Sequence, residues 1–352
     1  MALSAAIAVD GSVDQSLAVA TWIEVYEHLG QPTDYRIRFE VEIGSSDFDQ
    51  LIDARLDVGS ELSIMVPDPA GSQCLVKGPV GAQRIHFEHG GSGSYVEVGG
   101  SDTSITMDRE AKSTIWTDVT DSDAVTSILS GAGFVPDIDS TSAGHYETKH
   151  VMIQRESDLS FVRRLARRNG YAFWVTCDGF GVETAHFKPP PVDASPSATL
   201  KINATTPTVD GLDVRWDVER PTSIAGTQVD LSSLEDIDGA KSDAPLSSLG
   251  DQDLAAITGD TRSIFLAAPV DDAGDLQARS AGALVDSYFF VKATGETRLD
   301  LVGTPIRAHT VVKLQGAGSR HSGKYFVGGV RHMIDSDSYR MELELLRNGW
   351  GG

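Results

Sequence analysis

The segment at residues 154–175 carries the most regular pattern in the chain and constrains its local fold most strongly. Ser157 is a favourable N-cap residue, and Asp158 places negative charge in the first helical turn, where the helix dipole favours it. Apolar residues then recur at three- and four-residue spacing along one face: Leu159, Val162, Leu165 and Ala166. Asn169 and Gly170 both tolerate left-handed backbone and predict the end of the helix. Aromatic and β-branched residues follow, so the segment predicts an amphipathic helix that turns into a strand.

Four arginines fill the opposite face and the last turn of this expected helix: Arg163, Arg164, Arg167 and Arg168. Positive charge is favourable near a helix C-terminus. A phosphate or nucleic-acid site is one interpretation of such a cluster, and a solvated or ion-paired face is the simpler one. We expect these arginines to pair with acidic surface inside the chain or across protomers, and we treat them as candidate interface residues.

The overall charge limits the classes of partner. The chain has 352 residues and a formal net charge of -22, which argues against nucleic-acid recognition or binding to an anionic membrane through a general field. The N-terminus lacks the basic and apolar regions of a signal peptide, and no run of apolar residues is long enough to span a bilayer. We therefore expect no membrane insertion and assembly in the host cytoplasm. The acidity fits a saline host or simply an acidic soluble protein.

The two cysteines, Cys74 and Cys177, are distant in sequence and lie in strand-like contexts. A chain of this length does not need covalent cross-links for stability, so two buried free thiols are expected rather than a disulfide. No C-x-x-C spacing is present, which gives no indication of a metal site.

The chain divides by pattern into three regions. Residues 1–110 show short, alternating strands separated by glycine-rich turns, typical of a barrel or sandwich. Residues 111–192 alternate helix and strand and end in three prolines, which predicts a small α+β domain. Residues 193–352 return to strands, with an acidic loop at 232–261 and a helix at 275–292. The expected fold class is mainly β, with an α+β insertion between two β-rich domains.

No arrangement of residues predicts catalysis or cofactor binding. His86 and His89, and His321 and His332, lie near turns without ligand partners at metal spacing, so surface or turn positions are expected. The glycine-rich run Q-G-A-G-S-R-H-S-G-K-Y precedes a strand rather than a helix, which favours a hairpin turn over a phosphate loop. The G-x-S-x-G, H-E-x-x-H and S-x-x-K patterns are absent. We predict no catalytic, metal or cofactor site and no enzyme activity.

Two segments resemble a known family. The run R-E-S-D-L-S-F-V-R-R-L-A-R-R-N-G-Y-A-F-W at residues 155–174 resembles the signature of the phage late control protein D and VgrG-type hub family. The later element G-x-Y-x-V-x-x-V-x-H, at residues 323–332, also resembles that family, as does the order of elements around both segments. The resemblance is strong at 150–176 and 296–347 and weak over the first 110 residues.

The resemblance implies a baseplate hub of a contractile phage tail or a phage-like injection system. Such hubs are homotrimers in which each protomer resembles two tail-tube β-barrels, so that a ring of six barrels joins the hexameric tube to the trimeric spike. The implied partners are two further copies, the tail tube protein, a spike protein and other baseplate proteins. Because the chain stops at Gly352 without the spike domain of VgrG proteins, we expect a separate spike protein to dock on it.

Two other classes of protein fit the sequence less well. A wall-degrading enzyme would need a catalytic domain of roughly 100 residues, and no segment is left over for one. A receptor- or carbohydrate-binding β-rich tail protein would account for the strands and the acidity. It would not account for the helix, turn and strand at 154–175. The residues do not distinguish a phage tail from an injection system.

Overall fold

The computed structural model describes residues 5–40, 53–89, 91–148, 151–229, 235–238, 245–260, 262–266 and 273–351. Its main feature is a sheet of thirteen strands drawn from both ends of the chain. The first group of strands is β1 (Ala6–Val9), β2 (Ser12–Val13), β3 (Trp22–His28), β4 (Asp34–Glu40), β5 (Glu61–Asp68), β6 (Gly71–His86) and β7 (Tyr95–Ser101). The second group is β15 (Ala198–Lys201), β16 (Val209–Trp216), β21 (Val291–Arg298), β22 (Val311–Gln315), β23 (Gly323–Asp335) and β24 (Tyr339–Arg347).

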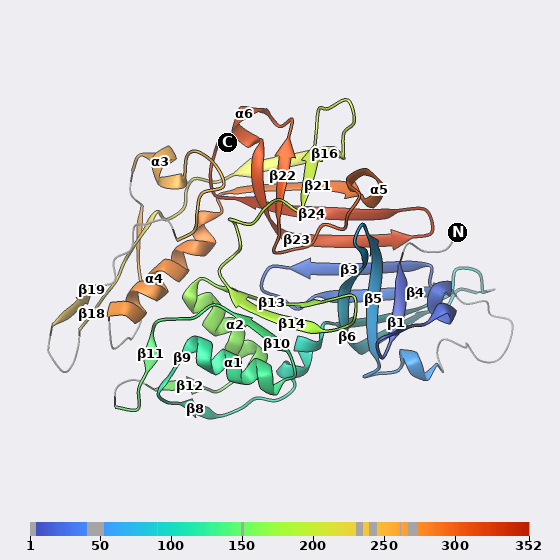
Figure 1. The fold of residues 1–352 in the computed structure, drawn as a ribbon, viewed down its shortest axis with the longest axis horizontal. Helices are drawn as coiled ribbons and strands as arrows, with labels where there is room; N and C mark the ends of the chain where they lie inside the picture. The colour runs from blue at the N-terminus through green and yellow to red at the C-terminus, as the bar shows by residue number, and fades with distance from the viewer. Residues whose placement is uncertain are drawn as a thin grey trace.

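The two groups meet where β3 pairs with β23 in antiparallel register, from His28 opposite Gly329 to Trp22 opposite Asp335. The main path of the sheet runs β16-β21-β24-β23-β3-β4-β7-β6-β5-β1-β2, and β22 and β15 branch from β23. Figure 1 shows the two groups stacked one above the other. Every pair in this sheet is antiparallel except β15 with β22. The expectation of a mainly β fold is confirmed, and no pairing among the described strands closes the path into a barrel.

Alternation of side chains explains why these segments form half-buried strands. In β4, Tyr35, Ile37 and Phe39 are buried, while the intervening positions are exposed or half-buried. One hydrophobic cluster combines residues of both groups, from Ile7 to Leu345. The two ends of the chain therefore share a core.

In Figure 1 the α+β unit lies below the second group of strands and to the left of the first, and it has its own core, which includes Val125, Phe161, Leu165 and Phe187. Its helices and larger strands are α1 (Asp121–Gly131), β10 (Val135–Ile138), α2 (Asp158–Asn169), β13 (Ala172–Cys177) and β14 (Glu183–Lys188). Two ribbons complete it: β8 (Thr114–Trp116) with β12 (Met152–Gln154), and β9 (Val119–Thr120) with β11 (Gly144–His145).

Helix α2 begins and ends where its sequence predicts. The Ser157 side chain accepts a hydrogen bond from the Ser160 backbone N–H, and Gly170 ends the helix in the left-handed region with φ 68°. The strand expected after it is β13, which pairs with β14 in an antiparallel hairpin. Helix α1 begins after its N-cap Thr120, which forms a capping box with Asp123.

One boundary differs from the expectation. The helix expected at 275–292 is α4 (Ala273–Tyr288), since Val291 already belongs to β21. Strand β6 is one continuous strand with a bulge near Val80. Between β21 and β22 lies the one-turn helix α5 (Leu299–Val302), which ends at Gly303 in the left-handed region.

The acidic region 232–261 lies partly outside the described residues. Its described part is not simply an exposed loop, because it contains α3 (Leu254–Thr258) with Leu254 buried in the main core. The remaining small elements are α6 (Gly318–His321), β17 (Ser223–Ala225) with β20 (Ser263–Phe265), and β18 (Thr227–Val229) with β19 (Asp236–Asp238). Within the described residues, no helix has both the length and the apolar character needed to cross a bilayer.

The expectation of two free thiols is wrong. Cys74 of β6 and Cys177 at the end of β13 form a disulfide, with their Cα atoms 5.5 Å apart. Their separation of 103 residues in sequence gives no sign of this, because β13 approaches β6 only in the folded chain. The bond ties the α+β unit to the main sheet.

Candidate functional site

The four arginines of α2 differ in their contacts. The Arg164 Nε donates a hydrogen bond to the Glu156 carboxylate at 2.6 Å. The Arg168 Nε donates to the Asp121 carboxylate at 2.9 Å. The side chains of Arg163 and Arg167 make no hydrogen bond or ion pair with any described residue. The interface role of the four stays a prediction, and Arg163 and Arg167 are the pair still available for it.

Arg168 holds a buried carboxylate in place. The Asp121 side chain is only 1% exposed and also accepts hydrogen bonds from His145 at 2.8 Å and from the Asn169 amide at 2.7 Å. Burial alone would raise the pKa of Asp121, but the hydrogen bond from His145 and the charge of Arg168 lower it. The Arg168 contact therefore joins α2 to the start of α1.

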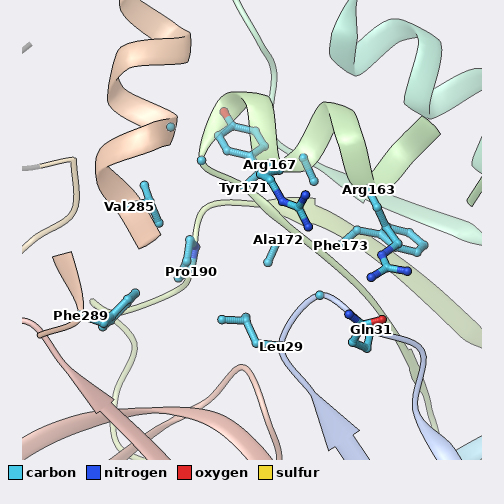
Figure 2. A pocket seen from close by; sticks show the side chains of 14 residues that line it. Leu29, Gln31, Arg163, Arg167, Tyr171, Ala172, Phe173, Pro190, Val285 and Phe289 are labelled. Carbon is cyan, nitrogen blue, oxygen red and sulfur yellow. The ribbon is translucent and has the colours of Figure 1, made fainter. Parts of the chain in front are cut away.

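A cavity of about 180 Å³ lies beside Arg163 and Arg167, between α2, α4 and the turn after β3 (Figure 2). We call it the α2–α4 groove. Its apolar lining includes Leu29, Phe173, Pro190, Val285 and Phe289. Arg163 and Arg167 reach toward it from α2, as Figure 2 shows, and Gln31 lies near Arg163.

The groove is electropositive on its α2 side. Burial and the neighbouring Arg167 charge lower the pKa of Arg163, and only Asp108 opposes this shift. The Asp108 carboxylate is already an acceptor for the Ser157 and Ser160 hydroxyls at the start of α2. Two guanidinium groups next to an apolar cavity favour a ligand that combines an anionic group with an apolar one.

Two glycines allow α2 and α4 to approach closely at the end of the groove. A Cβ atom on Gly170 would lie 2.7 Å from the Val285 Cγ2 atom. A Cβ atom on Gly282 would lie 2.6 Å from the Arg168 carbonyl oxygen. Gly170, which ends α2, therefore also shapes the groove.

Sequence reasoning found only the arginines of this site. Leu29, Pro190 and Phe289 come from three distant segments with no shared pattern, and tertiary packing alone brings them together. Arg164 and Arg168 do not line the groove. The spacing of Arg163 and Arg167, four residues apart on one helix, is the one local pattern that indicated this groove.

A second polar cluster is buried in the sheet around Glu27. The Glu27 carboxylate accepts hydrogen bonds from Arg307 at 2.5 Å and from His332 at 3.0 Å, and the Tyr339 hydroxyl contacts His332 at 2.9 Å. Burial alone would raise the pKa of Glu27, but the Arg307 charge and the His332 hydrogen bond lower it to about 2. The cluster joins β3, β23 and β24.

The expected surface or turn position is therefore wrong for His332, which is fully buried. His89 is exposed, and His86 and His321 are half-buried near turns. The glycine-rich run forms the expected connection of an antiparallel hairpin, with the one-turn helix α6 between β22 and β23. Within the described ranges, no three His, Cys, Asp or Glu side chains gather as a metal site would require.

Trp174 joins the α+β unit to the second group of strands. Its ring stacks on His186 at 4.7 Å and on His309 at 4.4 Å between ring centroids. His309 lies in the left-handed region with φ 61°, and burial lowers its pKa to about 3. Neutral His309 therefore serves as a packing surface, although no sequence pattern predicted this role.

The sheet order and the inserted α+β unit define the fold class. The chain shares the fold of the 43 kDa tail protein of prophage MuSo2 from Shewanella oneidensis, with a TM-score of 0.68, 11% identity and 98% of each chain covered. It is also similar to a tail protein from Neisseria meningitidis MC58, with a TM-score of 0.67, 15% identity and coverage of 100% and 98%. A third similar structure is an Escherichia coli component of the type VI secretion system. Its TM-score is 0.60 and its identity 16%, with 98% of this chain and 79% of that chain covered.

The family model described as the Alg8 N-terminal domain matches residues 3–336. The chain therefore belongs to the Alg8 N-terminal domain family. None of the curated proteins compared with the chain matches it.

Proposed function

We propose that this chain is a structural baseplate hub that adapts a hexameric tail tube to a trimeric spike, in a contractile phage tail or a phage-like injection system. The observation that carries the proposal is the agreement in fold with two tail proteins over at least 98% of each chain. The Escherichia coli protein with the same fold is described as resembling the bacteriophage T4 tail proteins gp27 and gp5. That description supports a structural role in a tail or injection system.

The proposed hub uses the two strand groups as its two tail-tube-like barrels. In this assignment residues 1–110 and 193–352 supply the barrel domains, and 111–192 supply the α+β domain between them. Three copies would then present six similar surfaces to the tube and three to the spike. Its work would be done by interfaces with two further copies, the tail tube protein, a separate spike protein and other baseplate proteins, without catalysis. Assembly would take place in the host cytoplasm.

Copy number tests this proposal. The chain would be tagged in its host, particles purified through the tag, and subunits quantified by mass spectrometry against the tube protein. We expect three copies per particle, together with tube and spike proteins. Recovery only in fractions without tube protein, or a copy number that is not three, would contradict the hub assignment.

A further inference from the structure

The turn between β13 and β14 presents one aromatic side chain to solvent. Phe180 is 92% exposed, more than any other large hydrophobic residue of the described chain. It follows Asp178 by two residues in the turn sequence D-G-F-G. A phenyl ring and a carboxylate thus project from the same hairpin tip.

The hairpin tip is held rigidly. One carboxylate oxygen of Asp178 accepts hydrogen bonds from the backbone N–H groups of Phe180 at 2.8 Å and Val182 at 2.9 Å. The Lys77 ammonium donates to the Gly181 carbonyl at 3.1 Å, and the Cys177 disulfide anchors the strand just before the turn. A backbone held in this way loses little conformational entropy when the tip binds.

The α2–α4 groove matches this tip in size and charge. A cavity of about 150 Å³ in a protein interior accommodates benzene, and the groove measures about 180 Å³. Its lining combines apolar side chains with Arg163 and Arg167, whose guanidinium groups form no ion pair with a described residue. The chain as a whole has a net charge of -22, so these two unpaired guanidinium groups stand out. Beside a cavity the size of an aromatic ring, they favour a ligand that has an aromatic side chain and a nearby carboxylate.

We propose that Phe180 of one copy inserts into the α2–α4 groove of a second copy, with Asp178 facing Arg163 and Arg167. This inference rests on the proposed hub function, because it supplies the contact between protomers. Ala172 and Phe173 at the start of β13 line the groove, whereas the tip follows the end of the strand at Cys177. The two surfaces therefore lie roughly 20 Å apart on one protomer, at ~3.3 Å per residue. Such a head-to-tail contact can close into a ring.

Self-association of the purified full chain tests the contact. Phe180→Ala removes the ring from an exposed position, and Arg163→Ala with Arg167→Ala removes the cations. We expect either variant to weaken self-association about 30-fold in sedimentation experiments, which is ~2 kcal/mol at about 1.4 kcal/mol per tenfold. Asp178→Asn keeps the turn acceptor and removes the charge, so it should weaken association about tenfold.

Two controls separate this contact from general surface effects. Phe265→Ala removes another exposed ring, which is 67% exposed, and Arg164→Ala removes an α2 charge that does not line the groove. Both should associate like the unmodified chain. Mixing Phe180→Ala protein with the Arg163 and Arg167 double variant should restore a one-to-one pair, because one copy keeps an intact groove and the other an intact tip.

A photo-crosslinking residue at position 180 locates the partner surface. We expect crosslinked dimers whose joined peptides include Leu29, Phe173 or Phe289. An unmodified chain that stays monomeric at high concentration, unchanged association of Phe180→Ala, or crosslinks to other surfaces or another protein would overturn the inference. If particles contain three copies but Phe180→Ala assembles normally, only this contact is wrong. If the crosslink forms but no particle contains the chain, the hub function is wrong instead.

Discussion

Arg163 and Arg168 lie on the same helix yet belong to different environments. Arg168 is bound to a carboxylate that is almost inaccessible to solvent, whereas Arg163 is half-buried beside the groove and forms no ion pair with a described residue. Sequence identified both as interface candidates because both lie on the polar face of one amphipathic pattern. It did not separate them, since no residue pattern marks Asp121 as the partner of Arg168. The pairing depends on how α1 packs against α2.

This difference predicts unequal effects on stability. Arg168→Ala leaves the Asp121 carboxylate buried without its cation, and we expect the free energy of unfolding to fall by about 3 kcal/mol. Arg163→Ala breaks no ion pair with a described residue and should change it by less than about 0.5 kcal/mol. Urea unfolding followed by circular dichroism measures both variants. Equal losses in the two would show that the Asp121 contact has no special role.

At the scale of elements, α2 and the β13–β14 hairpin are predictable because their signals are local. Ser157 at the start and Gly170 at the end act within a few residues, and the prediction matches the structure. The end of α4 was misjudged, since pairing with the neighbouring strand decides where β21 begins. The disulfide was missed for the same reason. A contact between β6 and β13 leaves no trace in either strand's own sequence.

The disulfide between Cys74 and Cys177 should contribute to the stability of the fold. It closes a loop of 103 residues between the main sheet and the α+β unit, and the chain-entropy model gives about 4–5 kcal/mol for a loop of that length. Replacing both cysteines, Cys74→Ser with Cys177→Ser, should lower the free energy of unfolding by roughly 2–5 kcal/mol. The reduced unmodified chain, unfolded in the same urea series, is the matched control. No difference between oxidised and reduced protein would argue against a stabilising cross-link.

At the scale of the whole molecule, the first and last strands form one sheet. The hydrogen bonds between β3 and β23 join residues about three hundred positions apart, so the strand patterns alone predicted a mainly β fold but not this pairing. The Glu27 cluster lies at the same junction and was not predicted either, because its members come from three strands and from the segment between α5 and β22. The resemblance of residues 155–174 to a hub family gave an expectation about architecture that residue patterns could not supply. The shared fold with tail proteins supports its general form.

Electron cryomicroscopy of particles purified from the native host tests the hub assignment most directly. We expect density for this chain at the centre of the baseplate, in three copies that surround a continuous channel between tube and spike. The same map would show whether the spike is a separate chain. Density at the fibres or the outer baseplate, or none in any particle, would contradict the assignment.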